Sequence, residues 1–399
     1  MSPLSDIKTV IHSLQRRSLL IGAVAAVLAL VGWFLDPEQF YRSYVLGFFF
    51  VLAIPLGSLG VVMLHHMTGG EWGFAIRRLL EASLRTLPLL AVFALPLLAA
   101  LFFGDLFPWA DAEVRAHDPV LKHKEAYLNE PFFVVRMAVY FVIWIGLGRV
   151  LVGLAEKHDR TGEPKLRKRM RAIAGPGIGI YVVTMTFAAF DWGMSLEPHW
   201  FSTIYGVMFL VGQVLSTWCF SIVMARWLAK REPFSRYITA DHFHDLGNLT
   251  FAFTMLWAYM AFSQYLIIWS GNLAEETPWY LRRSHEGWQI VAMLLVFFHF
   301  LVPFFALLAR KTKRNVQVLA KLALAIIVLR LVDLFWLIAP AFHAGLHVSW
   351  MDLVVPVALF ALWFAFYVGR LKGRPLISIQ DTSQEDHLET RLEGSVQHG

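Results

Sequence analysis

Two opposite charges occur inside one apolar stretch of this chain. Arg330 and Asp333 are three residues apart in the run 318–339, so on a helix they share one face. Within a bilayer, a charged side chain costs about 2.5–3.5 kcal/mol on insertion scales, so both charges need a reason to be there. They can neutralise each other as a structural ion pair, or they can form part of a proton path. His299 lies at similar depth in the run 288–309, and we expect it within reach of Arg330.

A second polar group stands between two apolar runs, in residues 187–206, FAAFDWGMSLEPHWFSTIYG. It combines two carboxylates and an imidazole with large aromatic side chains and contains no Lys or Arg. Such groups can exchange protons with the ring oxygens of a quinone, or release protons at the end of a proton path. Pro198 favours a fixed turn, so part of this chemistry can also be architecture. The candidate residues are Asp191, Glu197 and His199 and, for a quinone, also Trp200.

A third group lies at the opposite ends of the apolar runs. Imidazoles and carboxylates titrate on either side of neutrality, which is what proton uptake needs. Helix capping is the alternative for the two aspartates of this group. The group comprises His65, His66 and Glu71 in LHHMTGGEWG, Asp241, His242, His244 and Asp245 in ADHFHDLGN, and Arg149 at the end of the fourth run. Together the three groups predict a proton route across a membrane.

The chain is poor in ligands for metals and haem. The single cysteine, Cys219, excludes an intrachain disulfide, a Cys-based zinc site and a Cys-ligated iron–sulfur cluster within this chain. A b-type haem needs two imidazoles that face each other at similar depth, and His299 has no such partner. His343 and His347 are four residues apart, but in a polar loop without a third ligand nearby. We therefore expect no metal and no bound cofactor, and only a quinone remains possible.

The elements that must position these groups are membrane helices. The chain has 399 residues, of which 57% are hydrophobic and only 16% charged, against about 25% charged in soluble domains. Ten runs are long and apolar enough to cross a bilayer as helices, and none alternates like a barrel strand. They span about 18–35, 45–66, 84–104, 132–155, 172–191, 203–228, 246–270, 288–309, 318–339 and 350–369. The sequence predicts an all-α polytopic membrane protein with one membrane domain, 1–376, and a polar, flexible cytoplasmic tail, 377–399.

The distribution of basic residues predicts the orientation. Most of the 35 Lys and Arg residues lie before the first run, after the last, and in every second loop between them. By the positive-inside rule this side is cytoplasmic, and with it both termini. The net charge of +6 follows this sidedness and does not indicate a nucleic-acid partner. The outer loops 105–131 and 271–287 are acidic and aromatic, which suits either extrinsic partner proteins or plain solvation.

Two stretches are more specific than the hydropathy pattern: SLEPHWFSTIYG after FAAFDW, and LHHMTGGEWGFAIRRLLEASLRTLP. They resemble the F subunits of bacterial alternative complex III, within the NrfD-like, polysulfide-reductase-type family of membrane subunits. The likeness covers essentially all ten runs. The resemblance implies two four-helix bundles, formed by spans two to five and six to nine, with spans one and ten peripheral.

The resemblance also implies a place in a respiratory chain. Complexes of this kind lie in the bacterial inner (cytoplasmic) membrane, oxidise menaquinol or ubiquinol and pass the electrons to a cytochrome c or a similar acceptor. The implied partners are a homologous quinol-binding membrane subunit, an iron–sulfur subunit and cytochrome c subunits, which would carry the haems and clusters. We expect this chain to be a structural and proton-conducting subunit without its own redox centre.

Two alternatives stay open at this point. The chain can bind a quinone near the outer face, through Asp191, Glu197, His199 and Trp200. It can also be a stand-alone secondary transporter, for which broken helices in matching positions of two inverted repeats would be typical. Prolines do interrupt the runs, but they form no symmetric pair; they are Pro88, Pro96, Pro176 and Pro303.

Overall fold

The computed structural model describes residues 3–231 and 234–372. These residues are almost entirely helical and contain no strand, so the prediction of an all-α polytopic membrane protein is confirmed. The predicted tail, 377–399, lies outside the described residues.

Within the described part of the chain, nine helical segments are long and apolar enough to cross a membrane, and a bent pair raises the number to as many as ten. Most of the boundaries predicted from the sequence lie within a few residues of the ends of these helices, although several helices begin or end one or two turns beyond the apolar runs and α1 begins about four turns earlier. The segments are α1 (Pro3–Leu35), α2 (Pro37–Thr68), α8 (Glu130–Thr161), α9 (Pro164–Trp192), α10 (Ile204–Leu228), α12 (Ala240–Gly271), α14–η3–α15 (Trp288–Leu294, Leu295–Leu301 and Val302–Leu308), α17 (Val316–Ile338) and α18 (Met351–Arg370).

The third predicted span, 84–104, differs from a single helix. The chain there forms α3 (Trp72–Leu84), α4 (Leu87–Phe93) and α5 (Leu95–Phe103), with a bend of 41° between α3 and the later pair. Pro88 and Pro96 lack the N–H group that would continue the helical ladder, so each begins a new helix. At the bend, the Thr86 hydroxyl donates to the Ser83 carbonyl and accepts a 2.8 Å hydrogen bond from the Trp363 indole of α18.

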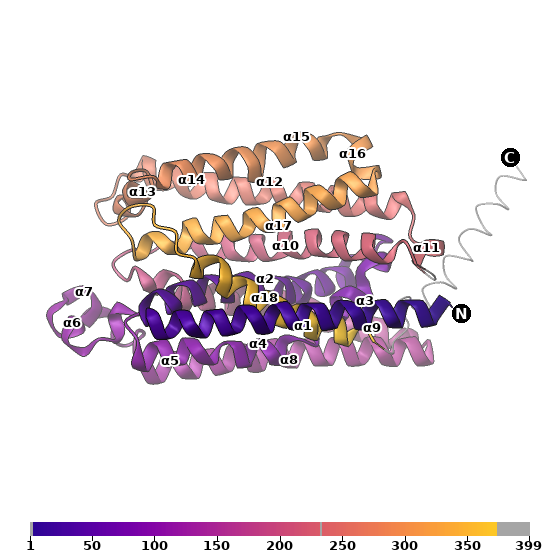
Figure 1. Ribbon diagram of the computed structural model, residues 1–399, viewed down its shortest axis with the longest axis horizontal. Coiled ribbons are helices and arrows are strands. Elements are labelled where there is room, and N and C mark those ends of the chain that lie inside the picture. Colours follow the sequence, from indigo (N-terminus) through magenta and orange to yellow (C-terminus); the bar gives the residue numbers. More distant parts are fainter. Residues whose placement is uncertain (1–2, 232–233, 373–399) are drawn as a thin grey trace, which may run out of the picture.

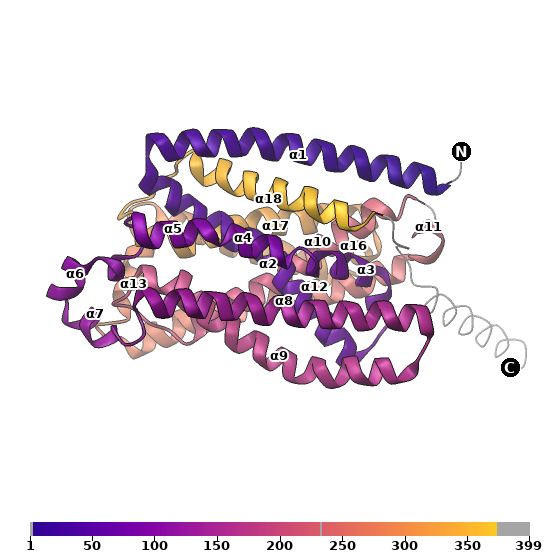
Figure 2. The same cartoon turned by 90° about the horizontal axis from the view of Figure 1, so that it is seen from below.

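The helices form two groups around a central pair, α2 and α10 (Figure 1). In their most apolar windows 89% of the α2 residues and 83% of the α10 residues are buried, the highest shares among the nine unbroken spans of the described chain. α2 packs against α3, α9 and α18, whereas α10 packs against α9, α12 and α17. α1 and α18 lie side by side along the outside, as Figure 2 shows. The resemblance implies two bundles with spans one and ten peripheral; α1 fits that position, but α18 also packs against the central helix α2.

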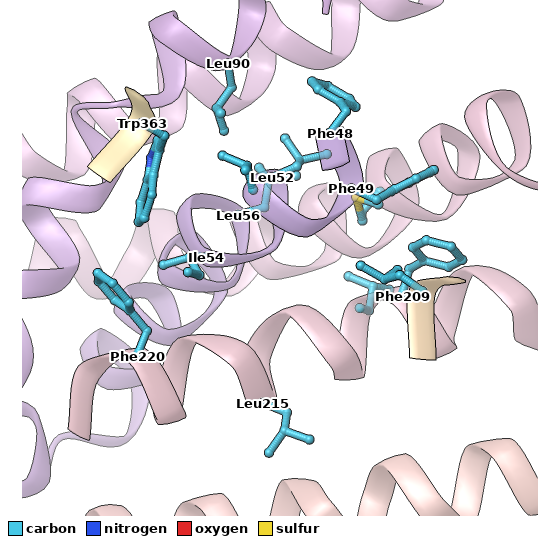
Figure 3. Packing of buried hydrophobic residues seen from close by; sticks show 14 of the residues in the cluster. Phe48, Phe49, Leu52, Ile54, Leu56, Leu90, Phe209, Leu215, Phe220 and Trp363 are labelled. Carbon is cyan, nitrogen blue, oxygen red and sulfur yellow. The ribbon is translucent and has the colours of Figure 1, made fainter. Parts of the chain in front are cut away.

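The two central helices approach closely because α2 has a glycine where they touch. A Cβ at Gly57 of α2 would overlap the Gln213 carbonyl and the Thr217 hydroxyl of α10. The Thr217 hydroxyl donates a 3.1 Å hydrogen bond to the Ile54 carbonyl, which joins α10 to the backbone of α2. Nearer the N-terminal ends of both helices, the rings of Phe49 and Phe209 are in contact, with their centroids 4.5 Å apart (Figure 3). Small residues and interhelical hydrogen bonds of this kind stabilise membrane helix pairs.

Short helices gather at both ends of the bundles (Figure 1). At one end lie η1 (Pro108–Ala110), α6 (Ala112–His117), α7 (Pro119–Lys124), η2 (Met194–Leu196), α13 (Thr277–Arg283) and η4 (Ala339–Ala341). At the other end lie α11 (Phe234–Tyr237) and α16 (Arg310–Arg314), together with the start of α1 and the end of α18. The first and last described helices therefore begin and end on the same side, which we call the basic end; the opposite side is the outer end.

Candidate functional site

The centre of the second bundle holds the pair predicted from the sequence. Arg330 and Asp333 on α17 form an ion pair, and they are only 1% and 2% exposed. The Trp257 indole of α12 donates a 3.2 Å hydrogen bond to Asp333. Gly212 of α10 faces the Arg330 guanidinium, and a Cβ there would overlap it. The ion pair of α17 is therefore enclosed by α10, which leaves space for the guanidinium, and by α12, which donates a hydrogen bond to the carboxylate.

His299 joins the same centre through an aromatic contact. Its ring meets Trp257 edge-on, with the centroids 4.4 Å apart at 89°. The imidazole is completely buried, and neither ring nitrogen has a hydrogen-bond partner among the described residues. His299 lies in the π-helical turn η3, a distortion that occurs frequently at functional sites. The expected proximity of His299 to the pair is therefore realised, with Trp257 as the intermediate residue that the sequence did not single out.

The 187–206 segment connects the two bundles at the outer end, and its charges are engaged by different elements. Asp191, at the end of α9, is 1% exposed and accepts two 2.9 Å hydrogen bonds from the Arg136 guanidinium of α8. Tyr140 adds a third at 2.7 Å. Arg136 also lies over the Tyr127 ring, 3.9 Å from its centroid. Asp191 is therefore an anchor between α8 and α9.

Glu197 joins the segment to the second bundle. Its two oxygens accept hydrogen bonds of 2.9 Å from Arg282 and 2.8 Å from Arg283, both in α13. The Arg283 side chain is fully buried, lies 3.6 Å from the Trp279 ring centroid and donates to the Leu337 carbonyl. Burial lowers the pKa of Arg283, and the Glu197 carboxylate opposes that shift. A buried cation with this many partners is a structural clamp.

His199 and its neighbours tie the segment to the 105–131 loop. The His199 ring nitrogen and an Asp118 oxygen are 2.6 Å apart, and Lys124 donates a 2.6 Å hydrogen bond to the Pro198 carbonyl. Desolvation raises the pKa of Asp118, but the backbone N–H of Leu121 and the His199 side chain outweigh it, and the net pKa is lowered. Burial lowers the pKa of Lys124.

The four residues considered for a quinone contact different elements of the protein. Trp200 stacks on Trp279 of α13, with ring centroids 4.7 Å apart and planes at 14°. Among the described residues, no side-chain hydrogen bond or ion pair links any two of Asp191, Glu197, His199 and Trp200; each has its partners elsewhere. The segment works as a three-way connector between α8, the 105–131 loop and α13.

The third group gathers where α2, α3 and α12 meet at the basic end. The His65 ring lies 3.2 Å from the Gly70 carbonyl and 4.9 Å from the Trp72 ring. His66 lies next to it, and Glu71 is the N-cap of α3. The His242 ring contacts Phe74 and forms a capping box with Thr239. His65 and His66 on α2 thus lie together, whereas His242 contacts α3 through Phe74 and also has a capping role.

The remaining members of that group lie on the surface. Asp241 pairs with Arg314 at 2.6 Å, and Asp245 lies 3.7 Å from the neighbouring His244. Asp241 therefore links α12 to α16, whereas the cap contacts of α12 come from Thr239. Arg149 is exposed on α8.

Sequence reasoning missed a partly buried ion network between α3 and α8. Arg77 and Arg78 each contact both Glu81 and Asp159, at distances of 2.6–3.0 Å. Arg85 pairs with Glu156 at 2.5 Å. The spacing of Arg77 and Arg78 to Glu81 was visible in the sequence as i,i+4 and i,i+3 pairs. The partners on α8 required the fold.

No grouping of three or more His, Cys, Asp or Glu side chains in the described ranges is arranged to hold a metal ion. His343 and His347 lie with ring centroids 4.6 Å apart, and His343 also approaches the Gln39 amide oxygen at 3.3 Å.

Neither a scan against protein-family models nor a search of the curated proteins finds a match for this chain. The class of the protein therefore comes from its fold alone, which is that of an all-α, multi-pass membrane protein.

Proposed function

We propose that this chain is an integral subunit of a quinol:cytochrome c, or similar acceptor, oxidoreductase in a bacterial inner membrane. It has a structural role, supports proton movement through its second bundle and carries no redox centre of its own. Its partners in this proposal are a homologous quinol-binding membrane subunit, an iron–sulfur subunit and cytochrome c subunits. The assignment to such a complex depends on the two motif-bearing stretches around 64–88 and 187–206.

The observation that carries the proton role is the buried centre of Arg330, Asp333, Trp257 and His299. A completely buried imidazole without a hydrogen-bond partner is costly, so a purely structural core would favour an apolar residue there. Ionisable groups within membrane spans mark ion or proton pathways in many transport proteins. The ion pair supplies a fixed field, and the imidazole supplies a group that can take up and release a proton.

The test is the Asp333→Asn variant in the purified complex, reconstituted into proteoliposomes. We expect quinol oxidation to continue while the ratio of protons moved to electrons transferred falls. Asp352→Asn is the matched control, because Asp352 accepts hydrogen bonds from Ser43 and Ser349 at the outer end of α18 and lies off this route. An unchanged ratio with Asp333→Asn would rule out the proton role.

Two further readouts separate the parts of the proposal. If Asp333→Asn fails to assemble while His299→Leu assembles normally, the ion pair has a structural role. The ratio of protons moved to electrons transferred is then measured in His299→Leu. Purification of the wild-type chain without any cytochrome-containing partner would contradict the assignment to the complex itself and favour a stand-alone transporter.

A further inference from the structure

A basic notch opens at the basic end, where the chain turns from α15 through α16 into α17. Its lining residues are Arg310, Lys311, Arg314, Asn315, Val316 and Gln317. The Asn315 side chain accepts hydrogen bonds from the backbone of Gln317 and Val318, so it caps α17 and holds the turn. The positive end of the α17 dipole, equivalent to about half an elementary charge, therefore lies beside the three cationic side chains.

The positive charge of this notch is only partly neutralised within the chain. Arg314 pairs with Asp241 at 2.6 Å. Lys313 turns inward and donates a 2.7 Å hydrogen bond to Asn248. Neither Arg310 nor Lys311 pairs with a carboxylate among residues 3–231 and 234–372, and both are exposed.

The α3–α8 network at the same end provides the contrast. There every arginine of the set Arg77, Arg78 and Arg85 has a carboxylate partner within 3.0 Å. Some basic residues at this end are thus neutralised within the described part of the chain, whereas Arg310 and Lys311 are not. The notch keeps an excess of cations beside a helix N-terminus.

The surface next to the notch is apolar. Phe305 and Leu308, in the last turn of α15, are 64% and 59% exposed, and Val318, in the first turn of α17, is 45% exposed. The notch thus places cationic groups directly above side chains that face the hydrocarbon of the bilayer. A soluble anion would use only the cations, whereas an anionic lipid would use both surfaces.

We propose that this notch binds the phosphate headgroup of an anionic phospholipid from the adjoining leaflet, with its acyl chains along the exposed faces of α15 and α17. Arg310 and Lys311 provide the free charge, and the remaining guanidinium N–H groups of Arg314 add directional donors. Basic pockets at the cytoplasmic ends of membrane helices bind cardiolipin and related headgroups in this way. The inference depends on the membrane fold alone and not on the proposed respiratory role.

The experiment is native mass spectrometry of the full-length chain, with its accompanying subunits, titrated separately with cardiolipin, phosphatidylglycerol and phosphatidylcholine. We expect the anionic lipids to be retained preferentially. The double variant Arg310→Gln with Lys311→Gln should weaken that retention by roughly tenfold to thirtyfold. Lys168→Gln with Arg169→Gln is the matched control, because it removes the same charge from exposed positions of α9 at the same end. Retention in the control should equal that of the wild type.

Equal losses in the two double variants would overturn the proposal, because attraction would then follow total charge and not this site. Full competition by inorganic phosphate would also overturn it, since the apolar surface would contribute nothing. A second measurement needs no variant: cardiolipin added to the wild-type protein in phosphatidylcholine nanodiscs should slow hydrogen exchange at 310–318 and not at 164–171. Hydrogen exchange that stays unchanged at 310–318 would contradict a lipid site. So would mass spectra in which the double variant loses a bound acidic protein and not a lipid.

Discussion

The Arg136 guanidinium on α8 and the Asp191 carboxylate on α9 face each other in a two-pronged ion pair, with both hydrogen bonds at 2.9 Å. Tyr140 supplies a further donor, and the Tyr127 and Phe132 rings cover the guanidinium. A charge that the sequence placed at the end of a span is therefore completely engaged within the first bundle. This geometry makes Asp191 a structural residue whose removal has a measurable cost.

Removing one partner of this pair should destabilise the protein strongly. Arg136→Met leaves a buried carboxylate unpaired, and we expect a loss of about 3–5 kcal/mol in the free energy of unfolding. Arg149→Met is the control, because Arg149 is exposed on the same helix. Thermal unfolding followed by fluorescence-detected size exclusion measures both. The double variant Arg136→Met with Asp191→Leu should recover much of the lost stability. Equal losses of stability in Arg136→Met and Arg149→Met would contradict a buried ion pair.

Neighbouring arginines on α13 should differ sharply in their importance. Arg283→Met removes a side chain that is 0% exposed and leaves Glu197 with a single partner, so we expect a cost of about 3–5 kcal/mol. Arg282 is 43% exposed, and Arg282→Met should cost only about 0–1 kcal/mol. The comparison uses the same unfolding assay. Similar costs for both would show that burial does not decide the contribution of these ion pairs.

The contact between α2 and α10 should be sensitive to a single methyl group. A Cβ at Gly57 overlaps backbone atoms of α10 that cannot move independently, so Gly57→Ala should destabilise by about 1–3 kcal/mol. Gly179 on α9 has open space around its Cα, and Gly179→Ala should be neutral or stabilising by up to about 1 kcal/mol. Thermal stability in detergent distinguishes them. A neutral Gly57→Ala would mean that the two helices are farther apart than described.

The contact between His199 and Asp118 should loosen in acid. The folded pKa of Asp118 is lowered, so its stabilising contribution is present above the unfolded pKa of about 3.9 and is lost as the pH falls through the lower folded pKa. We expect hydrogen exchange of residues 118–124, corrected for its intrinsic pH dependence, to accelerate below about pH 4. Asp118→Asn should exchange rapidly at all pH values. Identical pH profiles for the two proteins would exclude this contact as the cause.

Much of this molecule follows from local sequence. Apolar runs of span length can only be helices in a bilayer, because each backbone polar group must be paired within its own segment. Most of the predicted spans therefore coincide with helices, and Gly69, with φ of 70°, ends α2 as its type suggests. The broken third span was predicted only in part. Pro88 and Pro96 indicated that the helix is interrupted, but the helix begins at Trp72, in a stretch where polar and apolar residues are mixed.

For the candidate site too, the sequence predicted some features and only the tertiary structure decided others. The sequence alone determined that Arg330, Asp333 and His299 lie within membrane spans, since periodicity and hydropathy are local properties, and that Arg330 and Asp333 share a face. Only the tertiary structure decided that Trp257 connects His299 to the pair, that Asp191 belongs to Arg136, and that Glu197 belongs to Arg283. Those contacts join residues 42 to 86 positions apart, on elements whose rotation depends on how the helices pack against one another. Hydropathy does not encode that rotation, because a lipid-facing and a helix-facing residue are equally apolar.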